Sequence, residues 1–254
     1  MSSALELFVA AVAASTLGSM VGLGGGFILV PLLRLAFGFA PAEAAGTSLA
    51  MVIATGLGST ISNLRARRID LRVGMLVVAG GIPGSILGSS IVHRIASPIF
   101  DWLFAALVIA IALDFLFRRR HRIDDDANLH RSMHAALAVL SGLLAGVLGG
   151  LFGIGGGIAI VPALAYFSDV PIHGIAATSQ FAIALTSPVG FVTHALEGDT
   201  RWLQAIPLFL GGLLGGTIGP RIAARMHSAQ LTVAVSIALL VAAGAMILRD
   251  ARAF

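Results

Sequence analysis

A glycine-rich motif that ends in proline occurs twice in this chain, 131 residues apart. The first copy, GLGGGFILVP, runs from Gly22 to Pro31, and the second, GIGGGIAIVP, runs from Gly153 to Pro162. Because glycine gains little from helical order and proline has no N–H to donate, neither copy can continue as a regular helix. Both copies lie in apolar stretches, and a bilayer tolerates broken backbone only where protein covers it or where it lines a polar cavity. Two breaks at matching positions therefore indicate the binding site of a duplicated membrane transporter.

Eight segments of the sequence are apolar enough and long enough to cross a membrane. Seven contain no Asp, Glu, Lys or Arg, and these are 7–33, 44–63, 73–92, 135–167, 174–193, 202–220 and 229–248. The eighth segment, 97–117, is interrupted only by Asp101 and Asp114. Each is near or above the roughly 20 residues that span the hydrocarbon core. The sequence therefore predicts an all-α polytopic membrane protein that sits in the lipid bilayer.

Several classes of function are excluded by composition. There is no cysteine, so disulfides, thiolate metal sites and cysteine nucleophiles are absent. All sixteen cationic residues are arginines, and they lie in short loops between apolar segments, which is typical of membrane anchoring and not of nucleic-acid binding. The seven histidines show no clustered ligand spacing, and no serine-hydrolase elbow is present. We expect no enzymatic activity, no cofactor, no metal and no nucleic-acid partner.

The duplication extends well beyond the glycine motif. At the same offset, Thr47-Ser48 matches Thr178-Ser179, Asn63 matches His194, and a glycine ladder recurs as Gly80/Gly84/Gly88 and Gly211/Gly215/Gly219. The ladders predict close helix packing, because small residues four apart lie on one helix face. We therefore predict two tandem repeats, 1–122 and 123–254, each with about four apolar segments, within one integral membrane domain.

The first apolar segment of each repeat has two interpretations. Segment 5–37 would be about 50 Å long as a single helix, which is well over the thickness of the bilayer core. It is either a tilted broken span, which makes the repeats parallel, or a re-entrant pair of half-helices, which makes them inverted. The first topology places twelve of the sixteen arginines inside and the second places eleven, so the counts do not separate the two. We favour inversion, because two breaks that reach one substrate from opposite leaflets give alternating access a simple geometry.

The glycine breaks are the first candidate site. At Gly24, Gly25 and Gly26, and again at Gly155, Gly156 and Gly157, they would expose backbone N–H groups at the N-terminus of a half-helix. Such an end carries partial positive charge and unsatisfied donors, which suits an anion. The alternative is that these glycines only permit helices to cross closely. No carboxylate pair lies at the centre of any apolar segment, which favours an anionic substrate over a cationic one.

Polar side chains near the breaks are the second group of candidates. Thr47, Ser48, Thr178, Ser179 and Gln180 are expected at the start of the next helix, where they would either cap it or donate hydrogen bonds to a bound oxyanion. Asn63 and His194 are expected at the ends of those helices. Both are candidates for a proton relay, and His194 also has Glu197 and Asp199 close by in sequence.

These motifs resemble the TauE/SafE family of sulfite and organosulfur-anion exporters over nearly the whole chain. The resemblance rests on 22–31, 45–48, 63–71 and 80–84 in the first half, and on 153–162, 177–179 and 211–219 in the second. It implies a multi-pass permease of the cell inner membrane that moves sulfite, sulfonates or related sulfur-containing anions. We therefore expect a secondary transporter that exports small anions, with a passive anion channel on the same scaffold as the alternative. Proton coupling and a homodimer are compatible with the sequence.

Overall fold

The computed structural model describes residues 2–118, 134–168, 172–226 and eight residues between 236 and 246. Within these residues the chain is helical and contains no strand. Seven of the helices are long and apolar enough to cross a membrane. The prediction of an all-α polytopic membrane protein is confirmed. The expected segment 229–248 and the predicted boundary between the repeats at 122–123 lie largely outside the described residues.

The helices follow the order expected of two similar halves. The first half contains α1 (Ser2–Val21), α2 (Gly26–Leu35), α3 (Pro41–Arg65), α4 (Leu71–Ile91), the short 3₁₀ helix η1 (Val92–Arg94) and α5 (Ser97–Arg118). The second half contains α6 (Ala135–Phe152), α7 (Gly157–Phe167), α8 (Ile172–Leu196) and α9 (Trp202–Ala223).

Both glycine motifs break the helix, as the sequence predicts. Three glycines in each motif have left-handed backbone, with φ of 87°, 86° and 83° at Gly22, Gly24 and Gly25, and 71°, 77° and 79° at Gly153, Gly155 and Gly156. Residues with a Cβ rarely adopt this conformation, so the breaks depend on glycine. The prolines differ from expectation, because Pro31 and Pro162 lie inside α2 and α7 and do not end them.

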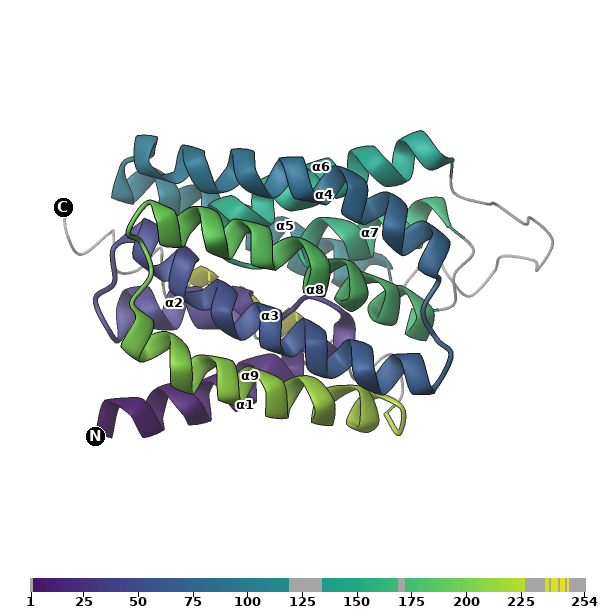
Figure 1. The fold of residues 1–254 in the computed structure, drawn as a ribbon, viewed down its shortest axis with the longest axis horizontal. Helices are drawn as coiled ribbons and strands as arrows, with labels where there is room; N and C mark the ends of the chain where they lie inside the picture. Colours follow the sequence, from purple (N-terminus) through teal and green to yellow (C-terminus); the bar gives the residue numbers. More distant parts are fainter. Residues whose placement is uncertain are drawn as a thin grey trace.

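The glycine ladders bring helix pairs into close contact. Along α4, Gly80 packs on Val139 of α6 and Gly88 packs on Val147. Along α9, Gly211 packs on Phe8 of α1 and Gly219 packs on Thr16. In Figure 1, α1 and α9 lie side by side along one edge of the molecule, and α4 and α6 lie along the opposite edge. The ladders thus act as packing faces.

The same contacts fix the directions of the helices. Residue numbers rise together along α1 and α9 and along α4 and α6, so each of these pairs is parallel. Two further pairs are also parallel, since Met51 and Thr55 of α3 face Gly212 and Gly216 of α9, and Gly74 and Gly81 of α4 face Phe181 and Thr186 of α8. In contrast, α3 and α8 are antiparallel, because Gly46 faces His194 whereas Gly56 faces Ala184. Helices α1, α3 and α9 therefore run one way, and α4, α6 and α8 run the other way.

Helices that match in sequence thus run in opposite directions, since α1 matches α6, α3 matches α8 and α4 matches α9. The break also reverses the chain, because α1 begins and α2 ends on the same face (Figure 1). The residue that precedes α9, Arg201, contacts Phe39 and Glu43, which follow α2 closely. Glu6 and Arg34 therefore lie toward one face, which is the arrangement of the re-entrant, inverted alternative.

Arginine is distributed unequally between the two faces. Of the described residues, the face where α3 and α9 end holds Arg65, Arg67, Arg68, Arg72, Arg118, Arg221 and Arg225, and we call it the arginine-rich face. The opposite, arginine-poor face holds Arg34, Arg94 and Arg201. The positive-inside rule assigns the arginine-rich face to the cytoplasm.

Candidate functional site

The two glycine breaks meet backbone to backbone inside the protein. A Cβ added at Gly26 would lie 2.6 Å from the Gly153 carbonyl oxygen, and one added at Gly157 would lie 2.8 Å from the Leu23 Cα. Real Cβ atoms essentially never come this close to another atom. Gly26 and Gly157 must therefore be glycines for the two breaks to pack against each other. The structure therefore brings together the two glycine triplets that the sequence identified.

Each break presents the N-terminus of a buried helix. In α2 the first intrahelical bonds run from the Ile28 and Leu29 N–H groups to the Gly25 carbonyl, and in α7 those of Ala159 and Ile160 run to Gly156. The N–H groups one and two residues past each N-cap, which belong to Gly26, Phe27, Gly157 and Ile158, have no hydrogen-bond partner among the described residues. All four residues are buried. Two positive helix ends with free donors thus lie in the interior, an arrangement that favours an anion.

The serines on α3 and α8 bind the break of the opposite half. The Ser48 hydroxyl donates to the Gly153 carbonyl at 2.7 Å, and the Ser179 hydroxyl donates to the Gly22 carbonyl at the same distance. Ser48 also lies 2.9 Å from the Ala45 carbonyl of its own helix. These two hydroxyls therefore connect the halves at the breaks.

The preceding threonines accept hydrogen bonds from loops of the other half. Thr47 accepts from the Arg201 backbone N–H at 3.1 Å, and Thr178 accepts from the Asp70 backbone N–H at 3.0 Å. The interpretation of these hydroxyls as helix caps is wrong, because α3 begins at Pro41 and α8 at Ile172, several residues earlier. At the start of α3, the Glu43 carboxylate instead accepts from the Ala40 N–H at 3.0 Å.

Two buried polar groups near the breaks lack a hydrogen-bond partner among the described residues. Gln180 is fully buried, and its amide nitrogen lies 3.4 Å from the Gly18 carbonyl, while its amide oxygen contacts no donor in the part of the chain that the structure describes. The hydroxyl of Ser187, which likewise has no partner within the described residues, lines a narrow pocket together with Gly155 and Leu49. This pocket has no room for a water molecule. Ser187 was not predicted from the sequence, because the matching residue in the first half, Gly56, carries no side chain. The feature that could have identified Ser187 is a hydroxyl within an uncharged, apolar segment.

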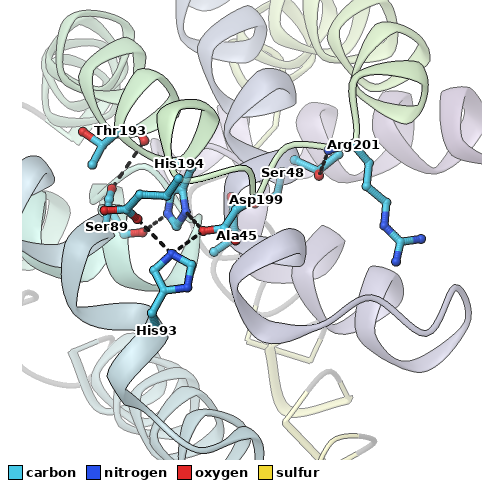
Figure 2. A network of polar contacts seen from close by, with 12 residues as sticks. Ala45, Ser48, Ser89, His93, Thr193, His194, Asp199 and Arg201 are labelled. Atoms are coloured by element: carbon cyan, nitrogen blue, oxygen red, sulfur yellow. Dashed lines mark hydrogen bonds and ion pairs between the residues drawn. The ribbon is translucent and has the colours of Figure 1, made fainter.

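His194 belongs to a polar network at the arginine-poor face (Figure 2). It is fully buried, and its Nε2 lies 2.9 Å from the Gly150 carbonyl oxygen while its Nδ1 lies 3.3 Å from Asp199 Oδ2. The same Asp199 oxygen lies 2.7 Å from Nε2 of His93, which also lies 2.9 Å from Glu197 Oε2. His93 was not found from the sequence, because it is about a hundred residues away from its partners.

Asn63 does not join this network. Its amide nitrogen donates to the Ser59 carbonyl at 2.9 Å, within α3. Since α3 ends on the arginine-rich face and α8 ends on the arginine-poor face, the structure separates Asn63 from His194. The two residues match in sequence but lie on opposite faces, because α3 and α8 run in opposite directions.

One group among the described residues offers closely spaced atoms of the kind that bind metals: His93, Glu197 and Asp199, within 4.8 Å of one another. The imidazole of His93 already contacts both carboxylates directly. These hydrogen bonds account for the cluster, and we assign no metal to it.

An ion pair buried in the first half anchors the end of α2. Arg34 and Asp101 are both 4% exposed, and Arg34 Nε lies 2.9 Å from Asp101 Oδ1. The guanidinium also donates to the Phe39 carbonyl at 2.8 Å and to the Ser97 hydroxyl at 2.7 Å. A cation near a helix C-terminus is favourable, so Arg34 stabilises α2 as well as its contact with α5.

Comparison with known proteins identifies relatives over most of the chain. A family model described as sulfite exporter TauE/SafE matches residues 7–246. A probable membrane transporter protein of Bacillus subtilis, YunE, is 32% identical over 226 residues, which cover 81% of this chain and 83% of that protein. Proteins with the same description from Methanocaldococcus jannaschii and Haemophilus influenzae are 27% and 26% identical over 75% and 82% of this chain, and over 72% and 80% of their own lengths.

Proposed function

The chain belongs to the TauE/SafE sulfite exporter family, which consists of membrane transporters and not enzymes, and we propose from this that it exports small sulfur-containing anions. The protein itself is a multi-pass membrane transporter. Sulfite is the first candidate substrate, followed by sulfonates and other organosulfur anions. Export places the substrate's entry on the arginine-rich face and its release on the arginine-poor face.

The observation that carries this proposal is the meeting of two buried helix N-termini at the glycine breaks. The N–H groups of Gly26, Phe27, Gly157 and Ile158, which have no partner within the described part of the chain, are suited to the oxygens of an anion such as sulfite. The hydroxyl of Ser187, 2% exposed and without a partner among the described residues, adds a further donor beside Gly155. The described carboxylates lie toward the two faces, so they do not oppose a negative charge at the centre.

Substrate entry requires the breaks to separate. The two glycine motifs pack against each other, and the pocket beside Gly155 is too narrow for water. In the proposed mechanism Ser48 and Ser179 exchange the carbonyls of Gly153 and Gly22 for substrate oxygens as the breaks part. Hydrogen bonds to charged groups are stronger than those between neutral groups, so this exchange favours the bound anion. Gln180, buried beside Gly18, lies within the same region and completes the proposed site.

Transport of radiolabelled sulfite in proteoliposomes tests the proposal. We expect saturable counterflow, in which sulfite inside the vesicles drives uptake of labelled sulfite, with competition by sulfoacetate, taurine, thiosulfate or sulfate reporting specificity. Protein-free liposomes correct for passage of the undissociated acid. Flux that rises linearly with concentration and shows no counterflow would support the channel alternative, and the absence of flux for every anion would overturn anion transport.

A further inference from the structure

We propose that His93, Asp199 and His194 form a proton pathway that opens to the arginine-poor face, with His194 as the proton-binding residue that couples proton movement to transport. This inference rests on the proposed transport function and adds its coupling ion and the route that the ion takes. It depends on four contacts. Figure 2 shows His93 and His194 on either side of Asp199, which both contact. The other two contacts are those of His194 with Gly150 and of His93 with Glu197.

The hydrogen bonds of His194 require a proton between its ring and Asp199. The Gly150 carbonyl can only accept, so the hydrogen of a neutral imidazole belongs on Nε2, 2.9 Å away. The Nδ1 atom then faces Asp199 Oδ2 at 3.3 Å, and this contact is favourable only when Nδ1 or the carboxyl group carries a second proton. Without that proton, a nitrogen lone pair faces a carboxylate in a site where the imidazole is fully buried. The pair is therefore a site that binds or releases one proton.

His93 connects this buried site to solvent. Its side chain is 41% exposed, and its Nε2 lies 2.7 Å from the same Asp199 oxygen that faces His194. When His93 takes up a proton from water, it can pass the Nε2 proton to Asp199 Oδ2, and Asp199 can pass it to His194 Nδ1. Each transfer breaks one N–H or O–H bond and forms another. Asp199 then returns to its initial state, and His93 does so once its remaining ring proton has moved from Nδ1 back to Nε2. Glu197, 2.9 Å from His93 Nε2, holds the imidazole in position.

The buried end of the pathway reaches the second glycine break. Gly150 lies two residues before the end of α6, where carbonyl groups lack intrahelical partners, and a cation there is favoured by the helix dipole. On its other side, His194 packs on α3, because a Cβ added at Gly46 would lie 2.9 Å from the His194 Cβ. Ser48, two residues further along α3, holds the Gly153 carbonyl at the break. The proton on His194 thus strengthens a contact between α8 and the end of α6 next to the proposed substrate site.

Among the described residues, the pathway occurs on one face only. The residues that match His194 and Asp199 in the first half are Asn63 and Arg68, which cannot form it. The described elements around His194 provide few charged or titratable side chains. These are His93 and Arg94 of η1, Glu197 and Asp199 between α8 and α9, and Arg201 and Glu43, which pair with each other at the starts of α9 and α3. Helix α6 contributes only the Gly150 carbonyl. By the positive-inside rule, protons enter this site from the outer face.

The test compares sulfite exchange with its response to a pH gradient in the same proteoliposomes. For the wild type and the control His134→Gln, a histidine outside the network, we expect counterflow at equal pH and a several-fold faster flux when a pH gradient is imposed. His194→Gln and Asp199→Asn should retain counterflow within about twofold and lose at least tenfold of the gradient-driven increase. A pH-sensitive dye trapped in the vesicles should report sulfite-dependent proton movement in the wild type and not in these variants.

The outcomes separate the two proposals. If sulfite counterflow occurs but the wild type ignores the gradient, or if His194→Gln still responds to it, the proton pathway is wrong while anion transport stands. If none of the anions moves, both proposals are overturned. Should His194→Gln fail to fold, the comparison of Asp199→Asn with Asp199→Glu decides. The glutamate variant should respond to the pH gradient and the asparagine variant should not. A gradient response in both variants, or in neither, contradicts the pathway.

Discussion

The hydroxyl of Ser48 donates a hydrogen bond to the carbonyl oxygen of Gly153 at 2.7 Å, so a helix of the first half holds the glycine break of the second half. Ser179 makes the same bond to Gly22 in the other direction. We predict that replacing either serine by alanine raises the apparent KM for sulfite roughly 5- to 150-fold, because a donor to a charged oxygen is lost, at a cost of about 1–3 kcal/mol. The measurement is the concentration dependence of sulfite counterflow.

Ser141→Ala is the matched control for these two variants, because the Ser141 hydroxyl donates within its own helix, to the Ala138 carbonyl at 2.8 Å, and makes no other hydrogen bond to the residues described. It should leave KM unchanged. Unchanged KM in both Ser48→Ala and Ser179→Ala would show that these hydroxyls only connect the two halves.

Ser187→Ala separates binding from stability. Its hydroxyl is buried and has no partner in the described residues, and such a group costs roughly 1–3 kcal/mol in the folded protein. We therefore expect this variant to be as thermally stable as the wild type or more stable, while its apparent KM for sulfite rises. A variant that loses stability and keeps its KM would place the hydroxyl in a structural role.

Gly25→Ala should abolish transport. A Cβ at Gly25 would lie 2.5 Å from the Ala14 carbonyl oxygen, and φ at this position is 83°. The matched control is Gly38→Ala, where φ is 67° and nothing lies within 4 Å of the added Cβ. Both variants carry the left-handed strain of about 1–2 kcal/mol, but only Gly25→Ala distorts the break. Equal loss of counterflow in the two variants would attribute the effect to backbone strain alone.

Asp101→Asn should lower the free energy of unfolding of the purified protein by roughly 3–5 kcal/mol, because it removes the carboxylate that balances the buried Arg34 charge. Glu43→Gln breaks the Arg201 pair, whose side chains are 38% and 30% exposed, and should cost no more than about 1 kcal/mol. Thermal unfolding in detergent measures both. Comparable losses of unfolding free energy in the two variants would contradict the expectation that the buried ion pair contributes more to stability than the exposed one.

The reversal of the chain at the first break can be checked by labelling, because the protein has no cysteine of its own. Single cysteines at Glu6 and Ala40 should react with a membrane-impermeant reagent from the same side, and a cysteine at Arg67 from the other side. Reaction of the first two from opposite sides would make the α1–α2 segment a full span and the inverted arrangement wrong.

Much of the fold follows from sequence patterns that act locally. The uncharged segments predicted the membrane-spanning helices, and the glycine triplets predicted the breaks, because both depend on residues adjacent in the chain. The start of α3 was also readable, since Pro41 at the first helical position and Glu43 two residues later are N-terminal signals. Overlooking them placed Thr47 and Ser48 too early in the helix.

Contacts between distant segments were not predictable in the same way. The arginine counts differed by one between the two topologies, so the direction of the second half became clear only from which glycines face which helix. His93 meets Asp199 through the packing of η1 beside the α8–α9 connection, and nothing in its local sequence marks it. Ser187 was hidden because the repeat comparison places it opposite Gly56, at which no side chain exists.

The reciprocal serine bonds also bear on how such a chain could arise. Ser48 reaches Gly153 as Ser179 reaches Gly22, and the helices that provide these residues are antiparallel. Two copies of a single half, inserted in the membrane in opposite orientations, would form the same pair of bonds across their symmetry axis. The chain thus has the contacts of an antiparallel dimer joined by a connector, and fusion would fix each half's orientation and let the histidine network form between the halves on one face and not on the other.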